Sequence, residues 1–286
     1  MSNLPITLDR LDDISERYRV ILCDVWGVVH NGVHVFADAI AALQRARQAG
    51  KIVVLVTNAP RPRREVEVQL RALGVPADAY DRLVTSGDAT RDLIRSGPRR
   101  VYHLGAERDL SLFEGIDVEL VEEPEASAVI CTGFVDDETE GPDDYAEMLM
   151  RFRARDLPMV CANPDIVVER GDRLVWCAGA LARDYGLRGG RTLIAGKPHR
   201  PIYELALAEA SEIAGEPIGA GQALAIGDGM LTDIKGAAQN DIDALYISGG
   251  IHAREYGEPG RPDPERLAAF LAKHGHDPVA VMPHLR

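Results

Sequence analysis

The stretch that decides the fold is residues 18–24, YRVILCD, an apolar run that ends in a single acidic residue. Such a run is typical of a strand buried on both faces of a parallel sheet. Asp24 then lies at the carboxyl end of the strand, where open α/β sheets bind their ligands. The run predicts an α/β fold and makes Asp24 a candidate site residue. The alternative is an aspartate that caps the following turn.

Strands and helices alternate on both sides of this run. Residues 51–56 are rich in valine and predict a second strand, and residues 38–49 before it predict a helix that ends at Gly50. This alternation implies right-handed crossovers and a parallel sheet. Further strands are predicted at 101–105, 128–133, 159–163, 223–226 and 244–248, and further helices at 66–73, 145–154, 202–213 and 234–239.

Composition narrows the class of protein. The chain has 286 residues, 46% hydrophobic and 27% charged, which is typical of one large globular domain or two smaller ones. It has 32 Lys and Arg residues and 45 Asp and Glu residues, and this acidic excess argues against nucleic acids and anionic membranes as partners. Four cysteines without a Cys-x-x-Cys pair, and the absence of a long apolar segment, lead us to expect a cytoplasmic protein without a signal peptide or membrane span.

A second acidic group follows the strand predicted at 223–226. Asp228 stands between two glycines, and Asp233 follows five residues later. Carboxylates are the hard oxygen ligands that Mg²⁺ prefers, and Asp24 on a neighbouring strand could complete such a site. The alternative is a Gly-Asp-Gly turn followed by an aspartate at a helix N-terminus, where the helix dipole favours it.

Thr57 and Asn58 end the second strand, and Lys197 lies between Gly196 and Pro198. A hydroxyl and backbone N–H groups at a strand end can bind the oxygens of an anion, and an ammonium group can offset its charge. A threonine that ends a strand, an asparagine in a turn and a solvated lysine are the alternatives for these residues.

Several short motifs in order resemble those of the haloacid dehalogenase superfamily of phosphatases, in particular class IIA, the NagD-like branch. The resemblance spans residues 18–252. It rests on DVWGVVHNG at 24–32, VTN at 56–58, TSG at 85–87, NPD at 163–165, GKP at 196–198 and GDGMLTD at 227–233.

The resemblance implies a Rossmann-like parallel-sheet core with an inserted α/β cap domain of the large C2 type. The distance in sequence between Asn58 and Lys197 leaves room for such an insertion. We expect the core at 1–86 plus 189–286 and the cap at 87–188.

It also implies a set of site residues. Asp24 would be the nucleophile that forms an aspartyl-phosphate. Thr57 and Lys197 would be the other catalytic residues. The implied substrate-binding residues are Gly27, Asn58, Asn163 and Asp165, and the implied Mg²⁺ ligands are Asp24, Asp228, Asp233 and the backbone carbonyl of Trp26. For Asn163 and Asp165 a simple Asn-Pro-Asp turn is the alternative.

Trp26 departs from the pattern of the family. Most phosphatases of the superfamily carry Asp-x-Asp in the first motif, and the second aspartate is the general acid and base. An indole cannot protonate a leaving alkoxide, and a general acid contributes about 10² to 10⁴ in rate. His30 is near in sequence and could supply a proton, although a structural histidine is the alternative.

Three functions follow from the resemblance. The first is an Mg²⁺-dependent phosphatase that acts on a small phosphorylated metabolite. The second is a dehalogenase or other non-phosphate hydrolase, because dehalogenases of the superfamily carry an aromatic residue at the position of Trp26. The third is a non-catalytic protein that binds phosphometabolites. The retained pair Asp228 and Asp233 favours the first; the substrate stays open, and a homodimer is one option for the oligomeric state.

Overall fold

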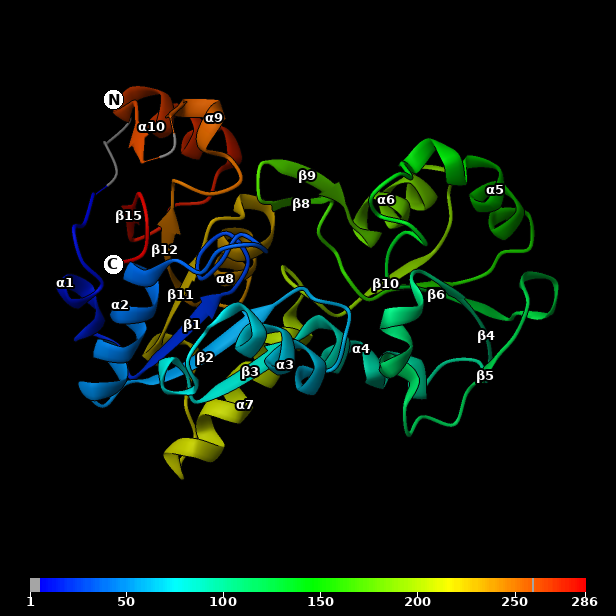
Figure 1. The fold of residues 1–286 in the computed structure, drawn as a ribbon, viewed down its shortest axis with the longest axis horizontal. Helices are drawn as coiled ribbons and strands as arrows, with labels where there is room; N and C mark the ends of the chain where they lie inside the picture. The colour runs from blue at the N-terminus through cyan, green and yellow to red at the C-terminus, as the bar shows by residue number, and fades with distance from the viewer. Residues whose placement is uncertain (1–5, 259) are drawn as a thin grey trace. The chain divides into compact units, whose positions relative to one another are not determined.

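The computed structural model describes residues 6–258 and 260–286 and divides the chain into two compact units (Figure 1). The first unit contains Met1–Thr57, Gln69–Val84 and Tyr203–Arg286. The second contains Asn58–Val68 and Thr85–Ile202. The predicted cap range, 87–188, lies within the second unit, which also includes residues 58–68, 85–86 and 189–202. The division into a catalytic core and a cap stays a prediction.

The first unit is built on a six-stranded sheet with the order β15-β12-β11-β1-β2-β3. The pairs β1–β2, β1–β11, β11–β12 and β12–β15 are all parallel. The strands are β1 (Val20–Asp24), β2 (Ile52–Thr57), β3 (Arg82–Thr85), β11 (Ala223–Gly227), β12 (Asp243–Ile247) and β15 (Ala280–Met282).

The centre of this sheet positions the candidate residues. All five residues of β1 are buried, as the apolar run predicts, and β1 lies between β2 and β11. Cys23 pairs with Leu55 on one side and with Ile226 on the other. Because parallel strands end at the same edge, the residues that end or follow these three strands gather at one edge of the sheet.

Helices flank the sheet, and α2 (Ala37–Gln48) shows why they form. Ile40 and Leu43 bury one stripe of this helix, and the chain leaves it through Gly50 at φ +81°, a left-handed conformation that glycine adopts without strain. The helix predicted at 38–49 is confirmed. This unit also contains the helices α1 (Asp12–Ser15), α8 (Lys235–Gln239), α9 (Ala253–Tyr256) and α10 (Pro264–His274) and the hairpin strands β13 (Gly257–Glu258) and β14 (Arg261–Pro262). Two helices, α3 (Arg63–Leu73) and α7 (Arg200–Ala214), have residues in both units.

The second unit has its own parallel sheet, with the order β10-β7-β6-β4-β5. An antiparallel hairpin of β8 (Val167–Arg170) and β9 (Arg173–Trp176) accompanies it. The sheet strands are β4 (Arg100–Leu104), β5 (Glu119–Leu120), β6 (Ala128–Cys131), β7 (Met159–Cys161) and β10 (Thr192–Ile194), and the helices are α4 (Ser86–Arg95), α5 (Ala146–Ala154) and α6 (Ala178–Leu187).

Both faces of the second sheet are buried. Val129 and Cys131 of β6 pack into a cluster that includes residues of α5 and α6. Ala128 and Ile130 pack into a second cluster that includes residues of α4. Because successive side chains of a strand point to opposite faces, this division shows helices on both sides of the sheet. The α/β class, with a parallel-sheet core and a second set of α/β elements, is confirmed.

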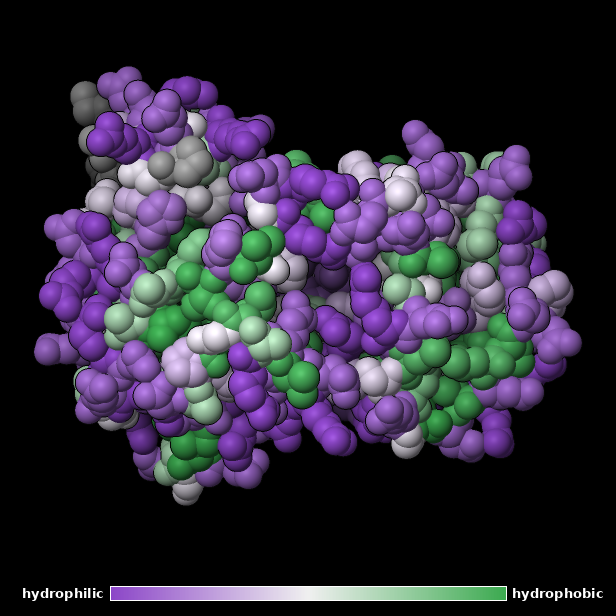
Figure 2. All heavy atoms as spheres, in the orientation of Figure 1, coloured by the Kyte–Doolittle hydropathy of each residue, from purple (hydrophilic) through white to green (hydrophobic). Residues whose placement is uncertain are grey.

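Hydrophilic side chains cover most of the visible face, with smaller apolar areas on both units (Figure 2). This agrees with the 27% of charged residues in the chain. Within the described ranges, no helix combines the length and the apolar character needed to cross a bilayer.

Candidate functional site

Three carboxylates meet at the carboxyl edge of the first sheet. Asp24 ends β1, Asp228 follows β11, and Asp233 lies in the π-helical turn η6 (Met230–Ile234). All three are buried, and one oxygen from each lies within 4.8 Å of the others. Carboxylates this close repel one another unless a cation offsets their charge. Hard oxygen donors at this spacing fit a divalent cation such as Mg²⁺.

Asp228 is held between two glycines and a backbone amide. The Ile251 N–H donates to Asp228 Oδ2 over 2.8 Å. A Cβ atom placed on Gly27 or Gly250 would lie 2.2 Å or 2.0 Å from the same oxygen, so a side chain at either position would displace the Asp228 carboxylate. Gly27 also has φ +85°, a left-handed conformation that glycine adopts without strain and that lets the chain turn sharply after Asp24.

Asp233 is held by its own turn. Its Oδ2 accepts the Gly229 N–H over 3.1 Å and faces the Thr232 hydroxyl at 3.3 Å. A Cβ atom on Gly227 would lie 2.2 Å from Asp233 Cγ. The glycines of the Gly-Asp-Gly motif therefore make room for this side chain, and the spacing of Asp228 and Asp233 has a local cause.

Thr57 and Trp26 lie beside Asp24 in the chain or the sheet. Thr57 is buried at the end of β2, one residue after Val56, the partner of Asp24 across the two strands. Trp26 is half-buried, and its ring meets the ring of His30 edge to face at 5.0 Å. Trp26 thus packs within its own loop.

His30 is held as a neutral side chain. Its Nδ1 accepts the Gly32 N–H over 2.8 Å, so the ring proton resides on Nε2. Burial lowers the pKa of His30 to about 4. A neutral imidazole is a very weak acid, so near pH 7 His30 does not supply the proton that Trp26 cannot. The structural alternative for this histidine is the one that the geometry favours.

A second group of predicted residues lies in the second unit. Asn58 Nδ2 donates to Asp165 Oδ1 over 2.8 Å and to the Lys197 carbonyl over 3.2 Å. The Lys197 N–H donates in return to Asn58 Oδ1 over 2.8 Å. Asn58 and Lys197 are buried, with 2% and 4% of their surface exposed. The Asn58 amide therefore joins segments that lie more than a hundred residues apart.

Asn163 shapes the turn that carries Asp165. Its Oδ1 accepts the Asp165 N–H over 3.0 Å. Gly179, near the start of α6, donates its N–H to the Asp165 carbonyl, and a Cβ atom there would lie 2.2 Å from the Pro164 carbonyl oxygen. Asn-Pro-Asp is thus a tight turn packed on a helix, and its role toward a substrate stays a prediction.

Two groups therefore form among the predicted site residues. The first unit brings together Asp24, Asp228 and Asp233, with Gly27 against Asp228, and the second unit brings together Asn58, Asn163, Asp165 and Lys197. Gly250 and Ile251, which contact Asp228, are not among the residues predicted from the sequence. The feature of the sequence that could have indicated them is the Gly249-Gly250 pair, which follows the strand predicted at 244–248.

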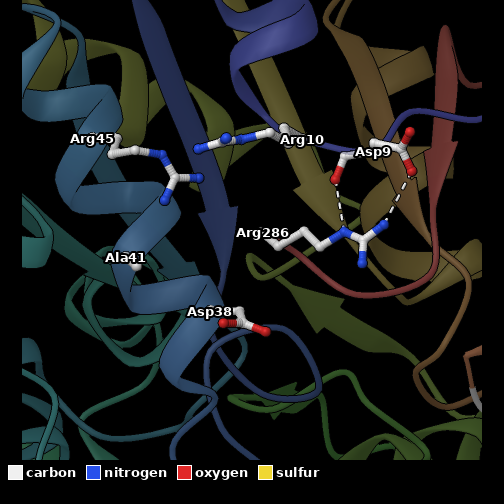
Figure 3. Close-up of a pocket in the computed structure, with 6 residues that line it drawn as sticks. All are labelled: Asp9, Arg10, Asp38, Ala41, Arg45 and Arg286. Carbon is white, nitrogen blue, oxygen red and sulfur yellow. Dashed lines mark hydrogen bonds and ion pairs between the residues drawn. The ribbon is translucent and has the colours of Figure 1, made fainter.

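A cavity of about 340 Å³ lies in the first unit and is lined by none of these residues (Figure 3). Three arginines surround it, but each is paired with a carboxylate. Arg286 contacts Asp9 at 3.1 Å, and Arg10 and Arg45 contact Asp12 at 3.3 Å and 3.1 Å. The lining residues are Asp9, Arg10, Asp38, Ala41, Arg45 and Arg286. We assign no role to this cavity, because the arginine charges are offset in place.

Comparison with known proteins identifies similar chains. A family model for haloacid dehalogenase-like hydrolases matches residues 21–119, and a second HAD-hydrolase-like model matches residues 194–281. A hydrolase of the haloacid dehalogenase-like family from Brucella suis 1330 is 58% identical, with a TM-score of 0.89 over 98% of this chain and 100% of that chain.

Two more distant structures share the fold. Glycerol phosphate phosphatase from Mycobacterium tuberculosis, solved in complex with magnesium, is 25% identical, with a TM-score of 0.64 over 89% of this chain and 78% of that chain. NagD from E. coli K-12 is 19% identical, with a TM-score of 0.69 over 93% of this chain and 96% of that chain.

Proposed function

Because the chain belongs to the haloacid dehalogenase-like hydrolases, we propose that it is a phosphatase that hydrolyses small phosphate monoesters and uses Mg²⁺. The observation that carries the proposal is the group of three buried carboxylates, Asp24, Asp228 and Asp233, with oxygens within 4.8 Å of one another. The similarity to glycerol phosphate phosphatase, solved with magnesium, supports both the substrate class and the ion.

Asp24, Asp228, Asp233 and the Trp26 carbonyl would hold the ion, whose charge would offset that of the phosphoryl group. The chemistry at the chain itself begins with Asp24. We propose that a carboxylate oxygen of Asp24 attacks phosphorus while the bond from phosphorus to the ester oxygen breaks. The alcohol leaves with a proton from water. A water molecule then cleaves the aspartyl-phosphate, which releases phosphate and restores the carboxylate.

The remaining predicted residues take supporting roles in this proposal. The buried Thr57 hydroxyl would donate to a phosphoryl oxygen, and Lys197 would supply positive charge. Gly27, Asn58, Asn163 and Asp165 would line the substrate site. A small phosphorylated metabolite as partner, a cytoplasmic location and a homodimer belong to the same proposal.

Trp26 sets the expected substrate preference. Without a side-chain acid, the leaving group departs with little help, because His30 is neutral and very weakly acidic. The aryloxide or carboxylate of an aryl or acyl phosphate departs readily without protonation, whereas the alkoxide of a sugar or alkyl phosphate does not. We therefore propose slow turnover overall and a preference for good leaving groups.

The test is a panel of aryl, acyl, sugar and alkyl phosphates, together with a 2-haloacid, each assayed with Mg²⁺ and with a chelator. We expect phosphate release that requires Mg²⁺ and is fastest for the aryl and acyl esters. Halide release without phosphate release would instead identify a dehalogenase. Tight binding of phosphometabolites without turnover of any compound would identify a binding protein.

A further inference from the structure

The loop 248–251 follows β12 and connects two parts of the first unit. At its start, the Ser248 N–H donates to the Met282 carbonyl and the Gly249 N–H to the Pro283 carbonyl, over 2.9 Å and 2.8 Å. At its end, the Ile251 N–H donates to Asp228 Oδ2 over 2.8 Å. The loop is therefore hydrogen-bonded to residues 282 and 283 at its start and to the Asp228 carboxylate of the candidate site at its end.

This loop lies too close to its neighbours for side chains at two positions. A Cβ atom on Gly249 would lie 2.4 Å from the Pro283 carbonyl oxygen, and one on Gly250 would lie 2.0 Å from Asp228 Oδ2. Real Cβ atoms essentially never show distances this short, and at Gly250 the backbone therefore lies directly against the Asp228 carboxylate. A small displacement of this loop would move the Ile251 N–H relative to the carboxylate.

A pair of buried tyrosines holds the start of the loop. The Tyr256 hydroxyl donates to the Ser248 carbonyl over 2.8 Å, and it lies 2.8 Å from the Tyr246 hydroxyl. The single proton of Tyr256 is directed at the carbonyl, so Tyr246 is the donor to Tyr256. The Ser248 hydroxyl has no hydrogen-bond partner among the described residues. The loop is therefore held through the Ser248 backbone.

The rings of these tyrosines are packed independently of their hydroxyls. Phe270 of α10 stacks on Tyr246 at 6.4 Å and meets Tyr256 edge to face at 5.1 Å. Both tyrosines are fully buried. Replacement of either by phenylalanine would thus remove a hydroxyl and leave the apolar packing in place.

We propose that Tyr256 is a positioning residue for Asp228. Its hydroxyl, oriented by Tyr246, holds the loop 248–251 where the Ile251 N–H fixes one oxygen of the Asp228 carboxylate. This hydrogen bond sets the orientation of the Asp228 carboxylate, which lies beside Asp24 and Asp233. The consequence for catalysis rests on the proposed function, but the hydrogen-bond relay itself does not.

The first measurement needs no metal and no substrate. Hydrogen exchange of the Ile251 amide is compared in the wild type and in Tyr256→Phe, both free of Mg²⁺. We expect exchange to be about threefold to tenfold faster in the variant, as the loss of one hydrogen bond predicts. Unchanged exchange at Ile251 in a folded variant would overturn the proposal.

The second measurement is Mg²⁺ binding by calorimetry, in the absence of substrate. Tyr256→Phe should weaken binding by about threefold to tenfold. Tyr246→Phe, which retains the bond from Tyr256 to Ser248, should weaken it by less than about twofold. In the assay, the Mg²⁺ concentration for half-maximal activity should rise in Tyr256→Phe, while kcat at saturating Mg²⁺ returns to nearly the wild-type value.

A matched control separates positioning from stability. Tyr185 in the second unit is also fully buried, and its hydroxyl donates to the Leu157 carbonyl over 2.6 Å. Tyr185→Phe removes the same kind of bond, so it should lower the melting temperature without a change in Mg²⁺ affinity or in Ile251 exchange. If Tyr256→Phe and Tyr185→Phe had equal effects on Mg²⁺ affinity, Tyr256 would have only a structural role and the proposal would be wrong. Wild-type protein that binds no Mg²⁺ would overturn the proposed function, and the exchange measurement would still decide the role of Tyr256.

Discussion

Two parallel sheets in this molecule carry polar residues at their carboxyl ends, but they use them differently. In the first unit, Asp24, Asp228 and Asp233 bring three carboxylates together. In the second, the Asn58 amide binds Asp165, which follows β7, and the backbone of Lys197, which follows β10. The first group accumulates like charge, and the second combines one cation, one anion and a neutral amide.

The difference bears on which group could hold a metal ion. The first group brings together three buried carboxylates, the hard oxygen donors that a divalent cation binds. The second group satisfies the Asn58 amide within the protein, which is what a rigid holding structure requires. The two groups thus differ in composition: the first contains three carboxylates, and the second contains side chains joined by hydrogen bonds to an amide.

One substitution in each unit tests whether the two groups differ in their importance for turnover, and this is where we expect the largest effect. Asp24→Asn should lower turnover by roughly 10⁴-fold or more, because an amide is not a nucleophile toward phosphorus. Asp165→Asn should cost less than about tenfold, because an amide oxygen can still accept the Asn58 hydrogen bond. Steady-state kinetics on an aryl phosphate, with melting curves for both variants, measures the contrast. Similar losses in two folded variants would remove the distinction between the groups.

A gain of activity sharpens the account of the first unit. Trp26→Asp should raise kcat/KM for alkyl phosphates by about 10²-fold, because the new carboxyl group can protonate the leaving oxygen. The measurement is a series of substrates of increasing leaving-group pKa, for the wild type and the variant. The wild-type rate should fall steeply along the series and the variant rate much less.

A flat series in the wild type would mean that some group already supplies the proton. Trp26 would then be a residue of packing or specificity. The Trp26→Phe variant is the matched control, since it removes the indole without adding an acid, and it should leave the slope of the series unchanged.

A smaller effect concerns stability in acid. The unfolded pKa of histidine is near 6.5, whereas burial lowers the pKa of His30 to about 4, so the unfolded state binds more protons between these values. The stability that neutral His30 contributes is fully present above pH 6.5 and is lost as pH falls toward 4. The loss amounts to about 3 kcal/mol at most. Denaturant unfolding between pH 7 and 4 should show a shallower decline for His30→Gln than for the wild type, and equal slopes would contradict this assignment.

Strand ends were predictable because their signal is local. The apolar run before Asp24 and the valines before Thr57 predict the two strands that carry them, and β1 and β2 end at these residues. Gly50 predicts where the helix 38–49 ends, and this residue has positive φ. Buried helices and strands can be predicted from short-range sequence patterns of this kind.

Contacts between distant segments could not be predicted in this way. The Ile251 N–H reaches Asp228 across 23 positions in sequence, and Asn58 reaches Asp165 across 107. The hairpin of β8 and β9 was missed because most of its residues are exposed or half-buried and form no apolar run. The helix predicted from residue 234 is preceded by the π-helical turn 230–234, which Asp233 shapes through its bonds to Gly229 and Thr232.

The most direct test of the central claim is calorimetry of Mg²⁺ binding to the wild type and to two variants. Wild-type protein should bind one Mg²⁺, and Asp228→Ala should weaken that binding by at least about tenfold, because it removes a carboxylate ligand from the group of three. Asp165→Ala, the matched loss of a carboxylate from the second unit, should leave Mg²⁺ affinity within about twofold of the wild type. Unchanged binding in Asp228→Ala, or an equal loss in Asp165→Ala, would contradict the claim that the three carboxylates of the first unit form the metal site.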